Sequence, residues 1–226
     1  MNQLIIGIGG VTNGGKTTLA RRVHEHVRNS FIIAQDNYFK DDSVVAVDDN
    51  GFKQYDVIDA LNMDSMMREI YNWKKDPKSY LISHGLKQSA HSKEANGVQN
   101  EVYVLITEGF LLYNYKPLNE LFDLRYFLNI PYDVCKKRRC ARVYIPPDPP
   151  GYFDGHVWPM YIKHRKEMED TVSELVYLDG TKTIHELFST VYENIMVQIQ
   201  KRTEIETHQT RQHFSSLQLS SFGKDT

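Results

Sequence analysis

One short segment near the N-terminus constrains this chain more than any other feature. The pattern G-x-x-x-x-G-K-[S/T] is matched at every fixed position by Gly10-Val11-Thr12-Asn13-Gly14-Gly15-Lys16-Thr17. An apolar run at residues 4–8 precedes the pattern, and residues 16–27 follow it with helical spacing of their apolar side chains. A glycine-rich turn between a buried strand and a helix presents backbone N–H groups to an anion, so the sequence predicts a phosphate-binding loop here.

The rest of the chain alternates short apolar runs with amphipathic segments. We expect buried strands at residues 4–8, 31–34, 102–107, 124–130 and 175–178. We expect helices at residues 16–27, 59–73, 131–142, 158–169 and 184–200. Alternating strands and helices require parallel pairing through right-handed crossovers. The sequence therefore predicts an α/β fold with a five-stranded parallel sheet and helices on both faces.

The composition excludes several classes of protein. The formal net charge is -2 for 226 residues, which argues against a protein that holds nucleic acid through its overall field. The two cysteines, Cys135 and Cys140, are too few for a disulfide framework, and their spacing fits no zinc motif. No apolar run reaches the length of a membrane span, and no basic segment opens a signal peptide. We expect a cytoplasmic protein, or one that is also nuclear.

Two polar segments interrupt or end the periodic pattern. Residues 76–100 carry Gly85, Gly97 and scattered Ser, Lys and His, which is typical of a surface loop. From Lys201 to Thr226 the chain gathers Thr, Gln, Ser and His, and we expect a disordered tail there. A single domain should therefore occupy residues 1–200.

Two other nucleotide-binding patterns fail. A dinucleotide fingerprint that begins at Gly7-Ile8-Gly9 has Thr12 where its third glycine should stand. A GTPase switch pattern D-x-x-G occurs at residues 48–51 and 148–151, but neither copy follows an expected strand, and no N-K-x-D motif is present. We interpret both copies as chance matches.

Two acids stand at the carboxyl ends of expected strands, where sheets of this kind bind ligands. Asp36 follows the second strand and Glu108 follows the third. A phosphotransferase needs a group that positions or deprotonates the acceptor hydroxyl and a second carboxylate near a metal ion. The alternative for each acid is a helix cap or a solvated loop residue.

The one dense basic cluster is Lys136-Lys137-Arg138-Arg139-Cys140-Ala141-Arg142. On a continuous helix, Arg138 and Arg142 share a face while Arg139 points about 100° away. That arrangement suits a lid helix that neutralises ATP phosphates on one face and directs Arg139 to an acceptor. The alternatives are a solvated helix face and a nucleic-acid patch.

Several segments together resemble the nicotinamide riboside kinase family. They are residues 10–18 and 35–36, Gly51-Phe52-Lys53-Gln54-Tyr55-Asp56, Glu108-Gly109-Phe110-Leu111-Leu112, and Tyr152-Phe153-Asp154-Gly155-His156-Val157-Trp158-Pro159. The run 147–160 is the most diagnostic, because P-loop kinases in general share only the phosphate-binding loop. The resemblance spans residues 1–200 and implies a P-loop kinase fold like that of uridine kinase, with a small lid at about residues 136–158.

The resemblance also implies roles in phosphoryl transfer. It gives Asp36 the role of general base and makes Lys16 the second catalytic residue. The Mg²⁺ ligands that it implies are Thr17, Asp36 and Glu108. The ATP-binding residues that it implies are Gly10, Val11, Thr12, Asn13, Gly14, Gly15, Lys16, Thr17, Thr18, Arg138 and Arg142.

On the acceptor side, the resemblance places two aromatic rings around the nicotinamide at Tyr55 and Tyr144. Ribose hydroxyls fall to Asp56 and Arg139, with Asp36 beside them. A cationic pyridinium ring gains energy between electron-rich aromatic faces, so this assignment is chemically sensible. Two departures, Asn37 where relatives often carry Asp and Ile145 after the second tyrosine, leave fine substrate preference open.

The expected activity is ATP-dependent phosphorylation of nicotinamide riboside to nicotinamide mononucleotide, with Mg²⁺, in NAD biosynthesis. The alternatives are a uridine or cytidine kinase and a non-catalytic interaction protein on the same fold. The expected partner is a nucleoside, nicotinamide riboside or also nicotinic acid riboside, with no nucleic acid and no membrane span. The oligomeric state stays open.

Overall fold

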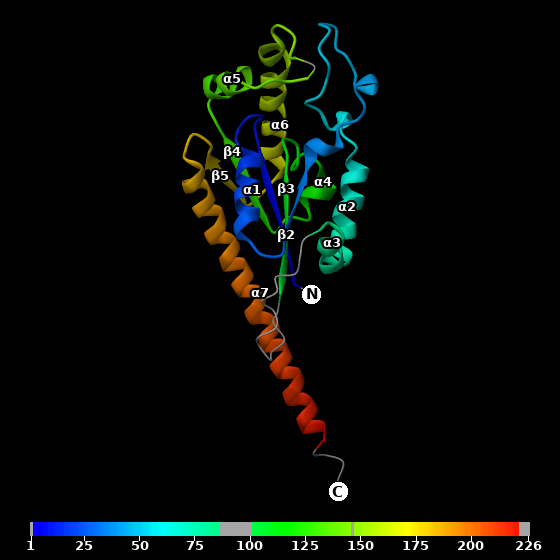
Figure 1. The fold of residues 1–226 in the computed structure, drawn as a ribbon, viewed down its shortest axis with the longest axis vertical. Helices are drawn as coiled ribbons and strands as arrows, with labels where there is room; N and C mark the ends of the chain where they lie inside the picture. The colour runs from blue at the N-terminus through cyan, green and yellow to red at the C-terminus, as the bar shows by residue number, and fades with distance from the viewer. Residues whose placement is uncertain (1, 86–100, 146, 222–226) are drawn as a thin grey trace.

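The computed structural model describes residues 2–85, 101–145 and 147–221, with side chains as far as Glu204. Its five strands form one parallel sheet in the order β2-β3-β1-β4-β5, which confirms the expected fold class (Figure 1). The strands are β1 (Asn2–Gly10), β2 (Ser30–Ala34), β3 (Val102–Glu108), β4 (Leu124–Asn129) and β5 (Leu175–Asp179).

Helices cover both faces of the sheet. The α-helices are α1 (Lys16–His26), α2 (Met63–Lys75), α3 (Pro77–Ser83), α4 (Lys116–Asn119), α5 (Tyr132–Cys140), α6 (Trp158–Thr171) and α7 (Ile184–Ser221). Short 3₁₀ turns occur at η1 (Gln35–Tyr38), η2 (Asp42–Val44) and η3 (Ile58–Ala60), and a π-helical turn at η5 (Phe153–Val157). Among the described residues, no helix is both long enough and apolar enough to cross a membrane.

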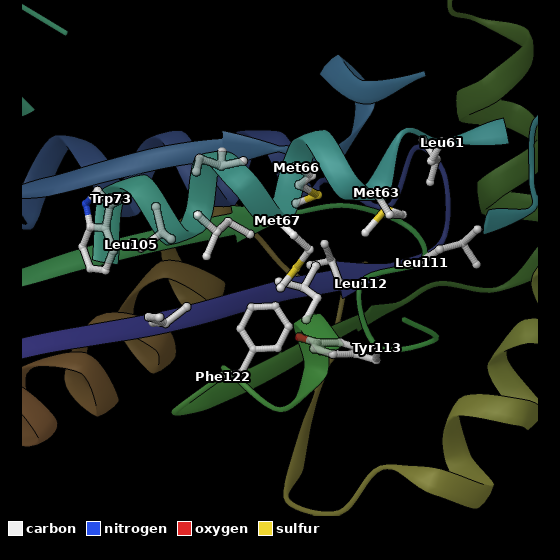
Figure 2. Packing of buried hydrophobic residues seen from close by; sticks show 14 of the residues in the cluster. Leu61, Met63, Met66, Met67, Trp73, Leu105, Leu111, Leu112, Tyr113 and Phe122 are labelled. Atoms are coloured by element: carbon white, nitrogen blue, oxygen red, sulfur yellow. The ribbon is translucent and has the colours of Figure 1, made fainter. Parts of the chain in front are cut away.

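The apolar runs of the strands are continuous because both faces of the sheet are buried. Alternate residues of each strand enter opposite cores. Ile5 packs with Leu105 and the α2 side chains Met66 and Trp73 in one core, which Figure 2 shows from close by. The other core lies under α1 and α7 and contains Leu4, Ile6, Ile8, Leu19, Val23, Val104, Ile106, Tyr126, Leu128, Val191 and Ile195.

Two local expectations need correction. The helix expected from residue 59 begins at Met63, because Asn62 caps it by accepting a hydrogen bond from the Ser65 N–H at 3.2 Å. The expected loop 76–100 contains helix α3, which Asp76 caps in the same way through the Ser79 N–H, with Pro77 at its first position. Residues 86–100 of that segment lie outside the described residues.

The expected boundary at residue 200 also differs from the structure. Helix α7 continues to Ser221, into the residues that we expected to be a disordered tail, and extends past the body of the molecule (Figure 1). No glycine or proline occurs between residues 201 and 221 to end the helix. Its continuation is also supported by Arg202, whose Nη2 lies 2.7 Å from Asp123 Oδ1 and whose Nε donates to the Gln3 carbonyl at 3.1 Å.

The segment expected to form the lid leaves the sheet after β4. Helix α5 ends at Cys140, earlier than expected, and the chain returns through η5 into α6. A third apolar cluster forms beneath this segment, where Val11 of the phosphate-binding loop packs near Ile130, Cys135, Tyr152, Phe153 and Val157. The segment is therefore packed directly against the loop that follows β1.

Candidate functional site

The loop between β1 and α1 has the backbone shape that its glycines permit. Gly10 has φ +136°, and a Cβ on it would lie 2.4 Å from the Leu128 carbonyl oxygen of the neighbouring strand. Gly15, at the start of α1, has φ +99°, a conformation that L side chains rarely adopt. Glycine at position 10 therefore lets the loop pass close to β4, and glycine at position 15 supplies the positive φ that precedes α1.

Lys16 is buried at the base of this loop. Only 8% of the residue is exposed, and Nζ donates to the Val11 carbonyl at 2.9 Å. Burial lowers the pKa of Lys16, and the carboxylates of Asp36 and Glu108 oppose that shift. The ammonium group thus donates to a carbonyl of the loop itself, in the electrostatic field of the two nearby carboxylates.

Glu108 ends β3 beside the phosphate-binding loop. It pairs in register with Ile8 of β1, and its Oε1 accepts a 2.8 Å hydrogen bond from the Thr17 hydroxyl. Burial raises the pKa of the Glu108 carboxyl, whereas Lys16 and the Thr17 hydrogen bond lower it. A buried acid with a lysine and a hydroxyl as its neighbours is equipped to hold a cation.

Asp36 lies one strand further along the same edge of the sheet. It lies two residues after Ala34, which pairs with Glu108, and its side chain is exposed. The hydroxyl of Thr17 and the carboxylates of Asp36 and Glu108 make a set of oxygen donors of the kind that Mg²⁺ prefers. These residues fit a magnesium site in the chemistry of their donors.

A buried glutamine, which sequence reasoning missed, joins the two strand ends that carry these acids. Gln35 is fully buried, and its Oε1 accepts from the Leu111 N–H at 2.9 Å. A Cβ on Gly109 would lie 2.5 Å from the Gln35 side chain, so the two segments touch. Gln35, the residue before Asp36, thereby connects the end of β2 with the turn after Glu108.

A cavity of about 440 Å³, the acceptor cavity, opens beside the phosphate-binding loop. It brings together eight of the residues singled out from the sequence: Thr12, Lys16, Asp36, Tyr55, Asp56, Arg139, Arg142 and Tyr144. Its other walls contain Phe39, Gly51, Lys53, Phe110, Ile145, Pro147, Asp148, Pro149 and Tyr152. Residues more than a hundred positions apart in the sequence thus share one cavity of a size suited to a small ligand.

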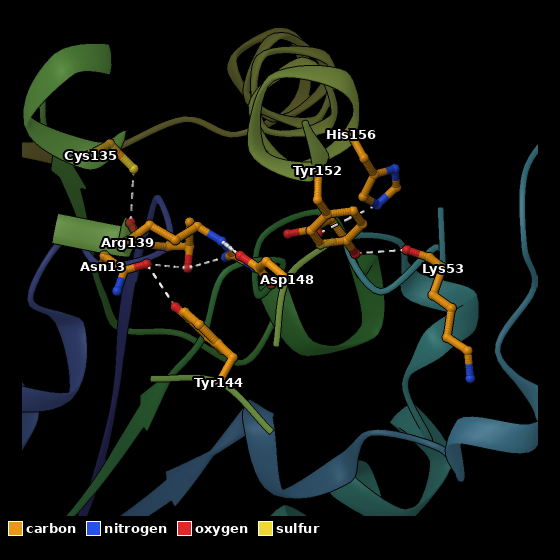
Figure 3. A network of polar contacts seen from close by, with 10 residues as sticks. Asn13, Lys53, Cys135, Arg139, Tyr144, Asp148, Tyr152 and His156 are labelled. Carbon is orange, nitrogen blue, oxygen red and sulfur yellow. Dashed lines mark hydrogen bonds and ion pairs between the residues drawn. The ribbon is translucent and has the colours of Figure 1, made fainter. Parts of the chain in front are cut away.

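Arg139 is fixed in the wall of this cavity by Asp148 (Figure 3). Its Nε lies 2.6 Å from Asp148 Oδ2 and its Nη2 lies 3.0 Å from Oδ1, a two-point ion pair. Nη1 donates to the Thr12 hydroxyl at 3.2 Å. Asp148 belongs to one of the two D-x-x-G matches that we interpret as chance. The residue nevertheless lines the acceptor cavity, where it holds Arg139.

The other two arginines of the basic cluster do not share one face as expected, because α5 ends before Arg142. Arg138 donates from Nη2 to the Gly180 carbonyl at 3.0 Å and lies beside the Asn13 carbonyl of the phosphate-binding loop. Arg142 lines the acceptor cavity instead, with its guanidinium carbon 5.2 Å from the centre of the Tyr144 ring.

The two tyrosines come from different parts of the chain. Tyr55 lies edge-on to Phe39, with ring centres 5.8 Å apart, and its hydroxyl contacts Asp42. Tyr144 belongs to the segment after α5, and its hydroxyl donates to Asn13 Oδ1 at 3.0 Å. The guanidinium carbon of Arg139 lies 4.5 Å from the Tyr144 ring centre, so this ring face already attracts a cation.

Tyr152, which the sequence places only within a motif, lines the acceptor cavity in the fold. Its hydroxyl donates to the Lys53 carbonyl at 2.7 Å, which joins the segment before α6 to the segment that carries Tyr55 and Asp56 (Figure 3). Asp48, in the other D-x-x-G match, accepts from the N–H groups of Asn50 and Phe52 and shapes the turn before Lys53. The Asp48 contacts are local, whereas the Tyr152 contact joins residues 99 positions apart.

Comparison with known proteins agrees with this geometry. A family model described as an AAA domain matches residues 6–159. Nicotinamide riboside kinase 1 of Mus musculus is 52% identical over 202 residues, covering 89% of this chain and 98% of the mouse protein. Nicotinamide riboside kinase 2 of Homo sapiens is 46% identical over 202 residues, covering 89% and 85%. Nicotinamide riboside kinase of Schizosaccharomyces pombe (strain 972 / ATCC 24843) is 27% identical over 187 residues, covering 70% and 77%. This chain belongs to the nicotinamide riboside kinase family.

Proposed function

We propose that this chain transfers the γ-phosphoryl group of ATP to the 5′-hydroxyl of nicotinamide riboside, giving ADP and nicotinamide mononucleotide, a step of NAD biosynthesis. One observation carries the proposal: a single cavity joins Lys16 and Asp36 to Tyr55, Asp56 and Tyr144. A phosphate-binding lysine, a base and a set of aromatic and acidic side chains are what such a transfer needs in one place. The names of the relatives agree with it.

The donor site in this proposal is the loop from Gly10 to Thr18. Its N–H groups and the N-terminus of α1 bind the phosphates of ATP, and Lys16 leaves the Val11 carbonyl to neutralise the β- and γ-phosphates. Arg138 lies beside the Asn13 carbonyl and adds positive charge on the α5 side. The assignment of Arg142 to ATP rests on a continuous helix that would place it on one face with Arg138; α5 ends before it, and it lines the acceptor cavity.

Magnesium fits this site in the proposal, with Thr17, Asp36 and Glu108 as the side chains that hold it, directly or through water. The ion would neutralise charge on the phosphates of ATP when bound. The Glu108 carboxylate is available for that role because it accepts its hydrogen bond from the Thr17 hydroxyl, which is itself a candidate magnesium ligand.

The acceptor site holds the riboside so that its 5′-oxygen faces the γ-phosphorus. Asp56 and Arg139 bind the ribose hydroxyls, and Asp36 orients the 5′-hydroxyl and accepts its proton as the new P–O bond forms and the bond to ADP breaks. Tyr55 and Tyr144 bind the nicotinamide ring. A ring face that attracts the Arg139 guanidinium attracts a pyridinium for the same electrostatic reason.

The test is a coupled assay that follows ADP release from Mg-ATP with nicotinamide riboside, nicotinic acid riboside, uridine and cytidine, with the product identified by mass spectrometry. We expect nicotinamide mononucleotide from nicotinamide riboside, and Lys16→Ala as the inactive control. A clear preference for uridine or cytidine would replace this proposal with a pyrimidine nucleoside kinase. Absence of turnover with every nucleoside would favour a non-catalytic interaction protein.

A further inference from the structure

A histidine near the acceptor cavity has no role in the proposal above. His156 lies in the π-helical turn η5, and only 3% of the residue is exposed. Its Nε2 is buried without a hydrogen-bond partner among the described residues. Buried polar atoms are almost always paired, and π-helical turns recur at functional sites, so this atom needs an explanation.

The nearest charged group to that nitrogen is Asp56. His156 Nε2 lies 3.5 Å from Asp56 Oδ2, slightly beyond a good hydrogen bond, and the Asp56 side chain is 19% exposed. Asp56 lines the acceptor cavity, whereas His156 lies behind it. The carboxylate therefore has one side toward the cavity and the other toward the imidazole.

The imidazole is held in this place by the neighbouring aromatic ring. The rings of His156 and Tyr152 are stacked with centres 5.1 Å apart and planes 23° from parallel (Figure 3). Tyr152 is itself tied to the Lys53 carbonyl, three residues before Asp56. The π-helical turn and the residue that precedes it thus contact the segment 53–56 at two points, through His156 and Tyr152 respectively.

We propose that His156 is a positioning residue, which donates from Nε2–H to Asp56 Oδ2 when the riboside binds and so directs the other carboxylate oxygen to the ribose hydroxyls. Catalytic contacts are often long before substrate binds and shorten in the complex, which accounts for the 3.5 Å separation. This inference rests on the proposed role of Asp56 at the sugar. It makes the π-helical turn part of sugar recognition and leaves the ATP site untouched.

The test compares His156→Phe with His156→Gln and His164→Phe. Phenylalanine keeps a flat ring against Tyr152 but removes the donor, whereas glutamine retains an N–H donor. His164 is the matched control, because its Nε2 is also buried without a hydrogen-bond partner in the described part of the chain and its Nδ1 pairs with Glu167 of its own helix at 2.9 Å. We expect KM for nicotinamide riboside to rise about 10-fold or more in His156→Phe, with KM for ATP unchanged and partial rescue by His156→Gln. His164→Phe should keep wild-type values.

A double-mutant cycle with Asp56→Asn separates positioning from a general packing role. If His156 acts through Asp56, His156→Phe adds little to the loss caused by Asp56→Asn, in kcat/KM and in calorimetric affinity for the riboside without ATP. Fully additive losses, equal effects on both substrates, or an unchanged riboside KM overturn the inference. Should His156→Phe fail to fold by thermal melting, the same cycle is run with His156→Leu, which also removes the donor. Failure of the wild type to phosphorylate nicotinamide riboside would instead refute the proposed function, so the two failures are distinct.

Discussion

The Thr17 hydroxyl donates to the Glu108 carboxylate at a distance of 2.8 Å. This bond connects the first turn of α1 with the end of β3 and places a hydroxyl and a buried carboxylate side by side. In the proposed function, both groups would hold Mg²⁺, directly or through water, when Mg-ATP is bound.

Substitutions at Thr17 should therefore change the response to magnesium. Thr17→Ser keeps the hydroxyl and should stay within a few-fold of wild-type kcat, whereas Thr17→Val, of the same shape, should lose roughly 100-fold or more. The measurement is kcat as a function of Mg²⁺ concentration at saturating ATP. A valine variant with wild-type magnesium dependence would contradict the assignment of Thr17.

Gly10→Ala should disrupt the protein more than Gly85→Ala. Both glycines have positive φ, so each alanine costs about 1 kcal/mol of backbone strain, but only at Gly10 does the new Cβ meet a backbone oxygen, at 2.4 Å. A Cβ on Gly85 meets nothing within 4 Å. The melting temperature and the ATP affinity should both fall for Gly10→Ala. For Gly85→Ala, only the melting temperature should fall, and only slightly. Equal effects would mean that the loop can move away from Leu128.

Tyr55→Ala and Tyr144→Ala should weaken the nicotinamide ring's binding. A stack on a cationic ring contributes about 1–2 kcal/mol in a partly desolvated site, so kcat/KM for nicotinamide riboside should fall roughly 5- to 30-fold. Tyr→Phe should be milder at both positions, since it removes only the hydroxyl contacts to Asp42 and Asn13. Unchanged kinetics in both alanine variants would remove the tyrosines from the site.

Deleting residues 201–226 should lower the melting temperature, whereas deleting 205–226 should not. The longer deletion removes Arg202 and with it the ion pair to Asp123 and the hydrogen bonds to Gln3 and Asn2. The loss should be about 1 kcal/mol, or roughly 2–4 °C in a chain of this size, because the ion pair is partly solvated. Identical melting of the two truncated chains would show that these contacts add nothing.

Alkylation should distinguish the two cysteines. Burial raises the pKa of the Cys135 thiol to about 11, and its Sγ lies 3.2 Å from the Thr12 carbonyl oxygen. Because the thiolate is the reactive form, a raised pKa leaves very little of it at pH 8, and reactivity should increase as the pH rises toward 11. Iodoacetamide followed by mass spectrometry should label the exposed Cys140 first and Cys135 only after unfolding. Equal labelling at pH 8 would contradict this placement of α5.

Sequence reasoning located what depends on local pattern. The phosphate-binding loop, the five strands and the acids Asp36 and Glu108 follow from strand ends and glycine spacing, because parallel strands bring their carboxyl ends to one edge. Tyr152 and Asp148 could not be placed in the same way. Tyr152 contacts Lys53, 99 positions away, and Asp148 pairs with Arg139 across the end of α5.

The errors have equally physical causes. The helical-face argument for Arg142 assumed that α5 continues to that residue, and the helix ends at Cys140. Polar composition predicted disorder from Lys201, yet a segment without glycine or proline extends a helix that is already formed. A polar composition indicates that a segment cannot form a hydrophobic core of its own. It does not exclude that the segment extends a helix formed by the residues before it.

The strand order has a consequence for how such a protein diversifies. The residues that face the acceptor come chiefly from two excursions of the chain, one between β2 and β3 and one between β4 and β5, while the phosphate-binding loop belongs to the central strand. Substitutions in the excursions can therefore reshape substrate choice without disturbing the phosphate-binding loop. The sheet can stay unchanged while substitutions in the two connecting segments, at the carboxyl ends of its strands, alter substrate preference.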